Sequence, residues 1–422
     1  MHKTTINIAR LSCWLLLFFT MLVWVWRCTI FSFSIFNYLS FIVPFILFSL
    51  LLLKYRQRLA IDLSTIIWMP WLFYILLLTG INLNIERFAY HFCCLALLMT
   101  SIHISIIQAF PKKLALFLGI FSITGIIFQY FLPELHSSII QPLFTGRDFE
   151  GYGLNGFTYQ VDVSANFILL FEMMWIYLCK DKVKPSIFWI VLIISILCIF
   201  LTGKRMHAAM SIIIPLFVYF ISRKSNSRNI FLFLILGCII CFGIIAFINH
   251  ADDFGENVFL HRFADTVERS DGDEDITSNR AFLGAIAIKL WEENPIFGIG
   301  DSNYVAYSGA EMDAHNAYLQ TLCEQGIVGF ILWIIPLIYC LYISCRILKR
   351  PKLDSNLRHW MQLSLFCQLQ FVLYGFTGNP TVNFDRFVLY FFSIAILSEV
   401  RYTIMSQQLA TLNIRTDSQH DE

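Results

Sequence analysis

Charged residues are scarce in this sequence. Asp, Glu, Lys and Arg make up 14% of its 422 residues, against about 25% in an average soluble protein. Hydrophobic residues make up 58%, and Phe alone occurs 42 times. The charge is missing in blocks, as a bilayer requires of the segments that cross it. The composition therefore excludes an ordinary soluble protein and predicts an all-α polytopic membrane protein.

Signals of several other classes are also absent from the sequence. The net charge is +1, and no basic stripe with interleaved aromatic residues points to nucleic acid. Nearly all of the 12 cysteines lie inside apolar runs, without metal-ligand spacing, which favours packing over disulfide or metal chemistry. The first apolar run leads directly into a second, so we expect no cleavable signal peptide.

Apolar runs of about 17–25 residues predict membrane-spanning helices. Twelve such runs occur, at roughly 11–26, 29–53, 64–83, 88–110, 114–132, 164–179, 186–202, 206–222, 229–249, 327–345, 360–376 and 386–400. They divide the chain into a first bundle of about nine helices (1–249), a long hydrophilic loop with short helices (250–326), three further helices (327–400) and a tail (401–422). A second long loop covers 133–163.

The distribution of basic residues predicts the orientation. One alternating set of segments holds 20 of the 30 Lys and Arg residues, although the other set contains both long loops. The richer side is expected to be cytoplasmic, which places both termini inside and both long loops outside. Nucleotides are absent outside, so chemistry driven by ATP is not expected there.

The second half of the long loop contains the most specific sequence pattern of the chain. Residues 278–295 predict an amphipathic helix that Ser278 or Asn279 can cap, with Phe282, Ile286 and Leu290 on its apolar face. A glycine turn at 298–300 follows. A new helix is then expected around His315, with Asp313 as its N-cap, and it leads into the span at 327–345. His315 should therefore lie near the outer membrane boundary.

The segment that begins at His315 resembles a known signature. His315 and Asn316, then nine residues, Gly326, two residues and Gly329 resemble the motif of the O-antigen ligases. The preceding Asn-Pro-Ile-Phe-Gly-Ile-Gly run at 294–300 is similar to that of the wider superfamily, which includes O-antigen and exopolysaccharide polymerases. The motif covers about 278–330, and the topology extends the likeness to the whole chain. The resemblance implies a GT-C-like fold in a bacterial inner membrane, with a periplasmic active site.

The resemblance also implies a reaction that needs no metal or other cofactor. A glycan moves from undecaprenyl diphosphate to a sugar hydroxyl, on lipid A-core in ligases and on another lipid-linked glycan in polymerases. His315 suits the general base, because its ordinary pKa lies near neutral pH. Arg280 and Arg205 match arginines that ligases are thought to use for the diphosphate. Further substrate contacts are expected from Lys204, Asn316, Tyr318, Gly326 and Arg147.

Several other interpretations remain open for these residues. Lys204 and Arg205 could simply anchor a helix at the interface, and Arg280 could pair with a loop carboxylate. The loop around Arg147 could be a connector. The acidic run Asp271–Asp275 has the Asp-x-Asp spacing of metal-dependent glycosyltransferases, although it lacks the glycine and glutamate of a calcium loop.

Polar residues within the spans have simpler explanations. Glu172 could be a buried functional carboxylate or could lie at the membrane edge. Asp385 and Arg386 could pair at the start of the last span. Packing is the expected role of three histidines, which are His91, His103 and His207.

Two functions of different classes, a transporter and a glycan transferase, are considered for the chain. A transporter with twelve spans usually has two similar halves, whereas here the loops are unevenly placed and no half-chain repeat is visible. A glycan transferase therefore fits better. The motif favours a ligase over a polymerase without deciding between them, and the neighbouring genes would discriminate.

Overall fold

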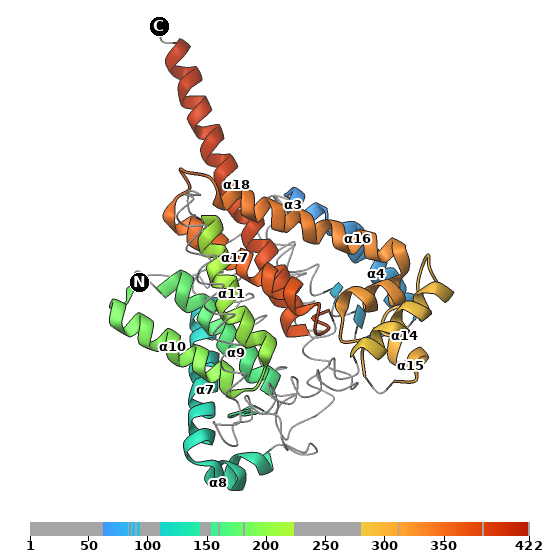
Figure 1. Ribbon diagram of the computed structural model, residues 1–422. Coiled ribbons are helices and arrows are strands. Elements are labelled where there is room, and N and C mark those ends of the chain that lie inside the picture. Colours follow the sequence, from blue (N-terminus) through green and yellow to red (C-terminus); the bar gives the residue numbers. More distant parts are fainter. Residues whose placement is uncertain are drawn as a thin grey trace, which may run out of the picture.

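The fold is all-helical in the part of the chain that the structure describes. The computed structural model describes residues 62–82, 84–85, 87–88, 91–92, 110–143, 153–158, 161–179, 182–222, 280–310, 312–381 and 384–420, and these residues contain no β-strand. The predicted all-α class is confirmed. Figure 1 shows a bundle of long helices with a smaller group, α14 and α15, at one side.

The helices have the following bounds. The N-terminal half contains α3 (Leu63–Ile66), α4 (Met69–Ile81), α7 (Phe110–Phe131), α8 (Pro133–Leu135), the π-helix η1 (His136–Ile140), the 3-10 helix η2 (Gln141–Leu143), α9 (Val161–Met174), the π-helix η3 (Trp175–Cys179), α10 (Pro185–Leu201) and α11 (Arg205–Ser222). The C-terminal half contains α14 (Arg280–Glu293), α15 (Tyr304–Ser308), α16 (Ala317–Leu348), α17 (Ser355–Tyr374) and α18 (Phe384–His420).

Several helices are long and apolar enough to cross a membrane. Among the described residues there are four, at Leu63–Ile81, Val161–Cys179, Arg205–Ser222 and Ala317–Leu348, and a fifth if the pair Leu116–Phe131 and Pro133–Ile140, bent by 113°, forms one span. Eight of the predicted spans fall on described helices. Those at 11–26, 29–53 and 229–249, and most of 88–110, lie outside the described residues. The protein is a membrane protein, and the count of twelve stays a prediction.

Two predicted spans lie within longer helices. Helix α16 begins at Ala317, and the non-helical φ and ψ of Gly326 divide it into the helix expected after His315 and the span expected from 327. Helix α18 continues past 400 to His420 and projects from the bundle in Figure 1. Hydropathy marks only the apolar part of a helix, whereas backbone hydrogen bonding continues through polar residues until a cap or breaker ends it.

Arg358 caps two helices at one end of the bundle. The Arg358 guanidinium donates to the carbonyl oxygens of Ser222, at 2.9 Å, Leu348, at 2.9 Å, and Arg350, at 3.0 Å. It thereby satisfies the C-terminal carbonyls of α11 and α16, which have no partner within their own helices. Both helix ends lie on the side that the basic residues predict to be cytoplasmic.

The opposite end gathers the N-termini of α9, α11, α16 and α18. Asp162, in the first turn of α9, contacts Lys204, just before α11, and Arg386, near the start of α18. The Ala317 N–H donates to the Gly375 carbonyl at 2.8 Å, which joins the head of α16 to the end of α17. The helices therefore alternate in direction, and the candidate site lies at this end.

A cluster of buried aromatic rings joins the described N-terminal helices to the last helix. Trp68 and Trp71, beside and in α4, pack on Phe387, Tyr390 and Phe391 of α18 with ring centroids 5.1–5.9 Å apart. All five side chains are at most 1% exposed. Such edge-to-face pairs stabilise a core beyond the area they bury, so α4 is held firmly beside α16 and α18.

Helix α14 is where predicted, and two residues of its predicted apolar face, Ile286 and Leu290, pack into a buried cluster. Its buried residues are Leu283, Gly284, Ala287 and Leu290, which pack toward α15 and α16. Phe282, predicted on the apolar face, is 64% exposed, because it lies about 100° around the helix from Leu283. The short residues Gly284 and Ala287 form the contact that the spacing of large apolar residues did not indicate.

Candidate active site

His315 has an unusual backbone conformation. Its φ of 50° places it in the left-handed region, which among the described non-glycine residues it shares only with Ser302. This conformation costs an L-residue roughly 1–2 kcal/mol. It persists only where the surroundings fix it, and such residues are common at active sites.

The residues on both sides of His315 are fixed by hydrogen bonds. The Ala314 N–H donates to Oε1 of Gln320 at 3.1 Å. Asn316 Oδ1 accepts from the N–H groups of Tyr318, at 3.0 Å, and Leu319, at 3.1 Å. The left-handed turn at His315 therefore lies between two anchored residues.

These bonds correct the predicted cap. Asn316, rather than Asp313, is the N-cap of α16. Asp313 Oδ1 accepts instead from Gln320 Nε2, at 3.0 Å. Both residue types cap helices well, but the left-handed residue at 315 separates Asp313 from the helix. The sequence around them gave no sign of that turn.

Gln320 connects the histidine segment to the interior. Its side chain is 2% exposed, and Nε2 also donates to Glu324 Oε1 at 3.1 Å. Glu324 Oε1 in turn accepts from the Tyr304 N–H at 3.0 Å. A buried amide that bonds both to the residues before His315 and to a buried carboxylate holds the segment in one arrangement.

The glycines of the motif bring the preceding loop against α16. Gly326 has φ 66° and ψ −173°, which interrupts α16 with a kink. A Cβ at Gly326 would collide with the Ile296 carbonyl. The Ile299 and Gly300 N–H groups donate to the carbonyls of Cys323, at 2.9 Å, and Glu324, at 2.8 Å. Gly326 thus has a backbone role, and its predicted substrate contact stays a prediction.

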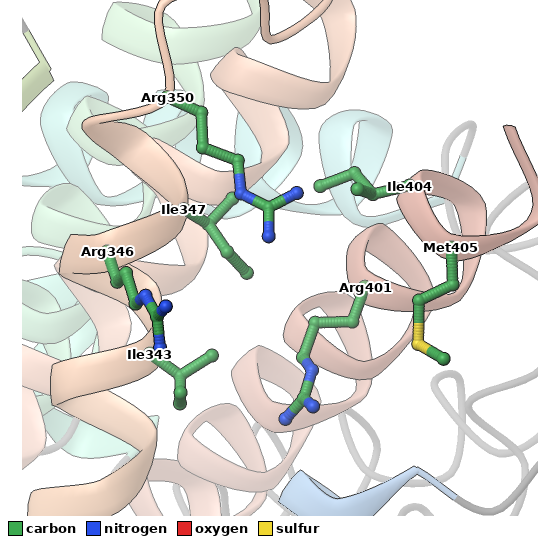
Figure 2. A pocket seen from close by; sticks show the side chains of 7 residues that line it. All are labelled: Ile343, Arg346, Ile347, Arg350, Arg401, Ile404 and Met405. Atoms are coloured by element: carbon green, nitrogen blue, oxygen red, sulfur yellow. The ribbon is translucent and has the colours of Figure 1, made fainter. Parts of the chain in front are cut away.

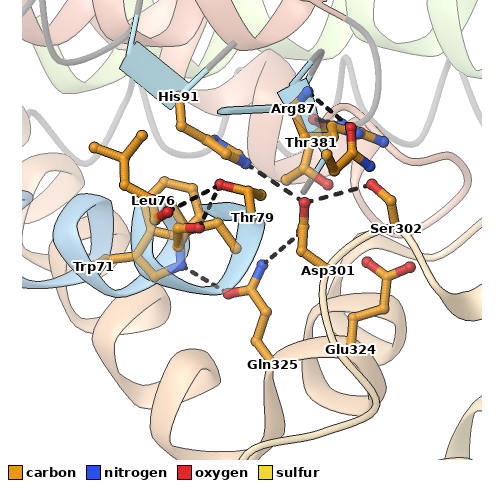
Figure 3. A network of polar contacts seen from close by, with 12 residues as sticks. Trp71, Leu76, Thr79, Arg87, His91, Asp301, Ser302, Glu324, Gln325 and Thr381 are labelled. Atoms are coloured by element: carbon orange, nitrogen blue, oxygen red, sulfur yellow. Dashed lines mark hydrogen bonds and ion pairs between the residues drawn. The ribbon is translucent and has the colours of Figure 1, made fainter. Parts of the chain in front are cut away.

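A second polar network lies behind this loop (Figure 3). Asp301, 6% exposed, accepts from Gln325 Nε2 at 3.4 Å and lies 3.7 Å from His91 Nε2. Gln325 Oε1 accepts from Trp71 Nε1 at 2.9 Å. Burial alone would raise the pKa of Asp301, but His91, the charge of Arg87 and the Gln325 amide together lower it. The network joins the loop to α4, and His91 is a partner of a carboxylate rather than packing alone.

The electrostatic surroundings of His315 favour its neutral form. The side chain is half-buried, and burial together with the positive charge of Arg280 lowers its pKa from the usual 6.5. Asp313 and Asp162 oppose this shift, and Lys204 adds to it. Arg280, Asp162 and Lys204 therefore lie near His315, although they are far apart in the sequence. A neutral imidazole can accept a proton at neutral pH.

Asp162 is a charged centre that was not among the predicted site residues. Its carboxylate lies 2.9 Å from Lys204 Nζ and 3.8 Å from Arg386 Nη2. Arg386 is 7% exposed, and its guanidinium carbon lies 3.8 Å from the centre of the Tyr374 ring. An acidic residue at the head of an apolar span is itself a functional signal, and this signal was available for Asp162.

His207 supports this group from within α11. It is 1% exposed, lies 3.0 Å from the Asn166 amide through Nε2, and packs on Tyr374 at 5.4 Å between rings. With its oxygen toward Arg386, the Asn166 amide accepts from Nε and Nη2 of that residue, both at 2.7 Å, and donates to His207. The packing predicted for His207 therefore includes a polar contact.

The structure describes two of the remaining predicted site residues, Arg205 and Tyr318. Arg205 is the first residue of α11, directly after Lys204. Tyr318 donates its hydroxyl to the Val372 carbonyl at 2.9 Å and packs on Phe376. Arg147, the acidic run Asp271–Asp275 and His103 lie outside the described residues.

Glu172 is buried in the interior of the bundle. It is 0% exposed in α9, and neither carboxylate oxygen has a hydrogen-bond partner among the described residues.

The Gln320 network predicts a loss of stability when that side chain cannot hydrogen-bond. In Gln320→Met, the Ala314 N–H and the Glu324 carboxylate lose a buried partner, which should cost about 1–3 kcal/mol. We expect a lower apparent melting temperature of the purified protein in detergent. Tyr307→Phe, which removes an exposed hydroxyl nearby, is the matched control. Equal melting of both variants would contradict the role of Gln320.

A family model matches part of the chain. The model of the O-antigen ligase family matches residues 190–334. A search of curated proteins found no match for the chain. The matched segment includes Lys204, Arg205, Arg280, His315 and Gly326, whereas Asp162 and Arg386 lie outside it. The chain is thus similar to the O-antigen ligase family over residues 190–334, which include the motif at His315.

Proposed function

We propose that this protein is an O-antigen ligase. It transfers a glycan from undecaprenyl diphosphate to a hydroxyl of lipid A-core oligosaccharide at the periplasmic face of the bacterial inner membrane. The observation that carries the proposal is His315, held in a left-handed turn within the matched domain, with a lowered pKa and Arg280 beside it.

His315 acts as the general base in this proposal. The acceptor hydroxyl attacks the anomeric carbon of the donor glycan and gives its proton to the imidazole. The new C–O bond forms as the bond from that carbon to the diphosphate breaks, and the diphosphate leaves with the electron pair. A fixed base that is neutral at working pH suits this step.

Arg280 binds the leaving diphosphate. It is exposed, and among the described residues it forms no ion pair, so its charge is available to an anion. It also opens the 14-residue helix α14, whose N-terminal N–H groups favour negative charge. The charge that develops on the diphosphate is then balanced by side chains and a helix terminus, and the transfer requires no metal.

Lys204 and Arg205 complete the cationic side of the site. Lys204 is paired with Asp162 and is thereby held in place, while Arg205 opens α11 next to it. We propose that Arg205 contributes directly to diphosphate binding. Asp162 and Arg386 position this end of the bundle.

Loss of the base should abolish transfer without unfolding the protein. His315→Asn removes the basic nitrogen, but Asn tolerates a left-handed backbone, so this variant separates chemistry from conformation. We expect the lipopolysaccharide ladder on a gel to disappear in His315→Asn, His315→Ala and Arg280→Ala, with normal amounts of protein in the membrane. Removal of a general base costs typically 10²–10⁴-fold in rate.

Lys289→Gln is the control for the arginine, because Lys289 is exposed on the same helix and is not among the charges that shift the pKa of His315. A normal ladder in His315→Asn would refute the proposed base.

The pH dependence of the purified enzyme tests the link between Arg280 and His315. The pKa of His315 is lowered, so its neutral form persists to lower pH, and the acidic limb of kcat/KM should lie below pH 6.5. In Arg280→Gln the pKa rises toward 6.5, and the acidic limb of the residual activity should move to higher pH. Lys289→Gln should leave the limb unchanged. An acidic limb that stays in place in Arg280→Gln would show that the arginine does not act on the histidine.

A gene deletion distinguishes the ligase from a polymerase of the same superfamily. Loss of a ligase leaves lipid A-core bare while lipid-linked polymer accumulates. Loss of a polymerase leaves single repeat units on the core. We expect the first phenotype, measured by lipopolysaccharide gels and by analysis of extracted lipid-linked glycans. Single repeat units on the core would contradict the ligase and support a polymerase.

A further inference from the structure

A pocket of about 210 Å³ lies at the end of the bundle opposite His315. It is formed where the last turns of α16 face the middle of α18 (Figure 2). Its lining consists of three arginines and four apolar side chains, which are Arg346, Arg350 and Arg401 with Ile343, Ile347, Ile404 and Met405. None of these residues takes part in the candidate active site.

The pocket carries a surplus of positive charge. Arg401 is paired with Asp62, 3.3 Å away, and donates to the Tyr339 hydroxyl at 3.1 Å. Arg346 and Arg350 are exposed, and neither forms an ion pair with any described residue. Two guanidinium groups therefore face a pocket without an acidic partner among the described residues. Planar guanidinium forks match the oxygens of a phosphate group.

The apolar half of the lining places the pocket at a membrane boundary. Ile343 and Ile347 belong to the apolar span that α16 forms. Tyr342 and Tyr402, on the same turns of α16 and α18, are 59% and 54% exposed. Exposed tyrosines next to basic residues at the end of an apolar span are typical of the level where headgroups meet hydrocarbon.

We propose that this pocket binds the headgroup of an anionic phospholipid. The phosphate lies between Arg346 and Arg350, and an acyl chain follows Ile343 along α16 toward the hydrocarbon. A free phosphate ester could use the arginines but not the apolar side chains. Basic pockets between membrane helices are suited to such lipids. The bound lipid would hold the far ends of α16 and α18 together, and this inference does not depend on the proposed reaction.

Native mass spectrometry of the full-length protein in detergent tests the proposal. Wild-type protein is mixed with equal amounts of phosphatidylglycerol and phosphatidylcholine, and the bound lipid is counted. We expect a preference for phosphatidylglycerol that falls roughly 10- to 30-fold in the double variant Arg346→Gln/Arg350→Gln, since each basic group near an anionic surface contributes a factor of about five.

The double variant Lys349→Gln/Lys352→Gln is the matched control, because it removes the same charge from exposed residues outside the pocket. It should keep the wild-type preference. An absence of preference in the wild type, or an equal loss in both double variants, would overturn the proposal. Displacement of the lipid by millimolar glycerol 3-phosphate would assign the pocket to soluble phosphate esters and would equally overturn it.

Discussion

The left-handed turn at His315 sets the direction in which the chain leaves the loop and enters α16, and the arrangement of the site depends on it. The turn costs free energy, and the bonds of Gln320 to the Ala314 N–H and of Asn316 to the first turn of the helix offset that cost. Another backbone conformation at His315 would change the direction of the imidazole. The same polar groups that stabilise the loop therefore fix the position of the proposed base.

The charges around this turn come from distant parts of the chain. Arg280 comes from the loop helix α14, Lys204 from the start of α11, and Asp162 from the start of α9. Arg386, on α18, lies beyond the matched domain and completes the group through Asp162. The family domain alone thus lacks two of the charged residues that hold its cationic side in place, and the helices outside 190–334 supply them.

Local patterns predicted those parts of the structure that local forces determine. Apolar runs gave the helices, and the glycines and Pro295 gave the turn between α14 and α16, because hydrophobic burial and backbone freedom act within a few residues. The predicted N-cap of α16 was wrong, since Asp313 and Asn316 are residue types that cap helices equally well. The contacts of Asp162 with Lys204 and Arg386 could not be predicted, because the sequence does not show which helix ends meet. The contact of Arg386 with Asp162 of α9 joins two helix ends that are far apart in the sequence.

The kink at Gly326 divides α16 into a short part and a long part, and the loop at 295–300 bonds to both. Before the kink, the carbonyls of Cys323 and Glu324 accept from the loop, and after it the N–H groups of Ile327 and Val328 donate to the loop. Membrane helices adjust their tilt when the thickness of the bilayer changes. Because the loop at 295–300 bonds to residues on both sides of Gly326, a change in the tilt of the longer part also moves the loop. The thickness of the surrounding membrane is thereby coupled to the segment that precedes His315.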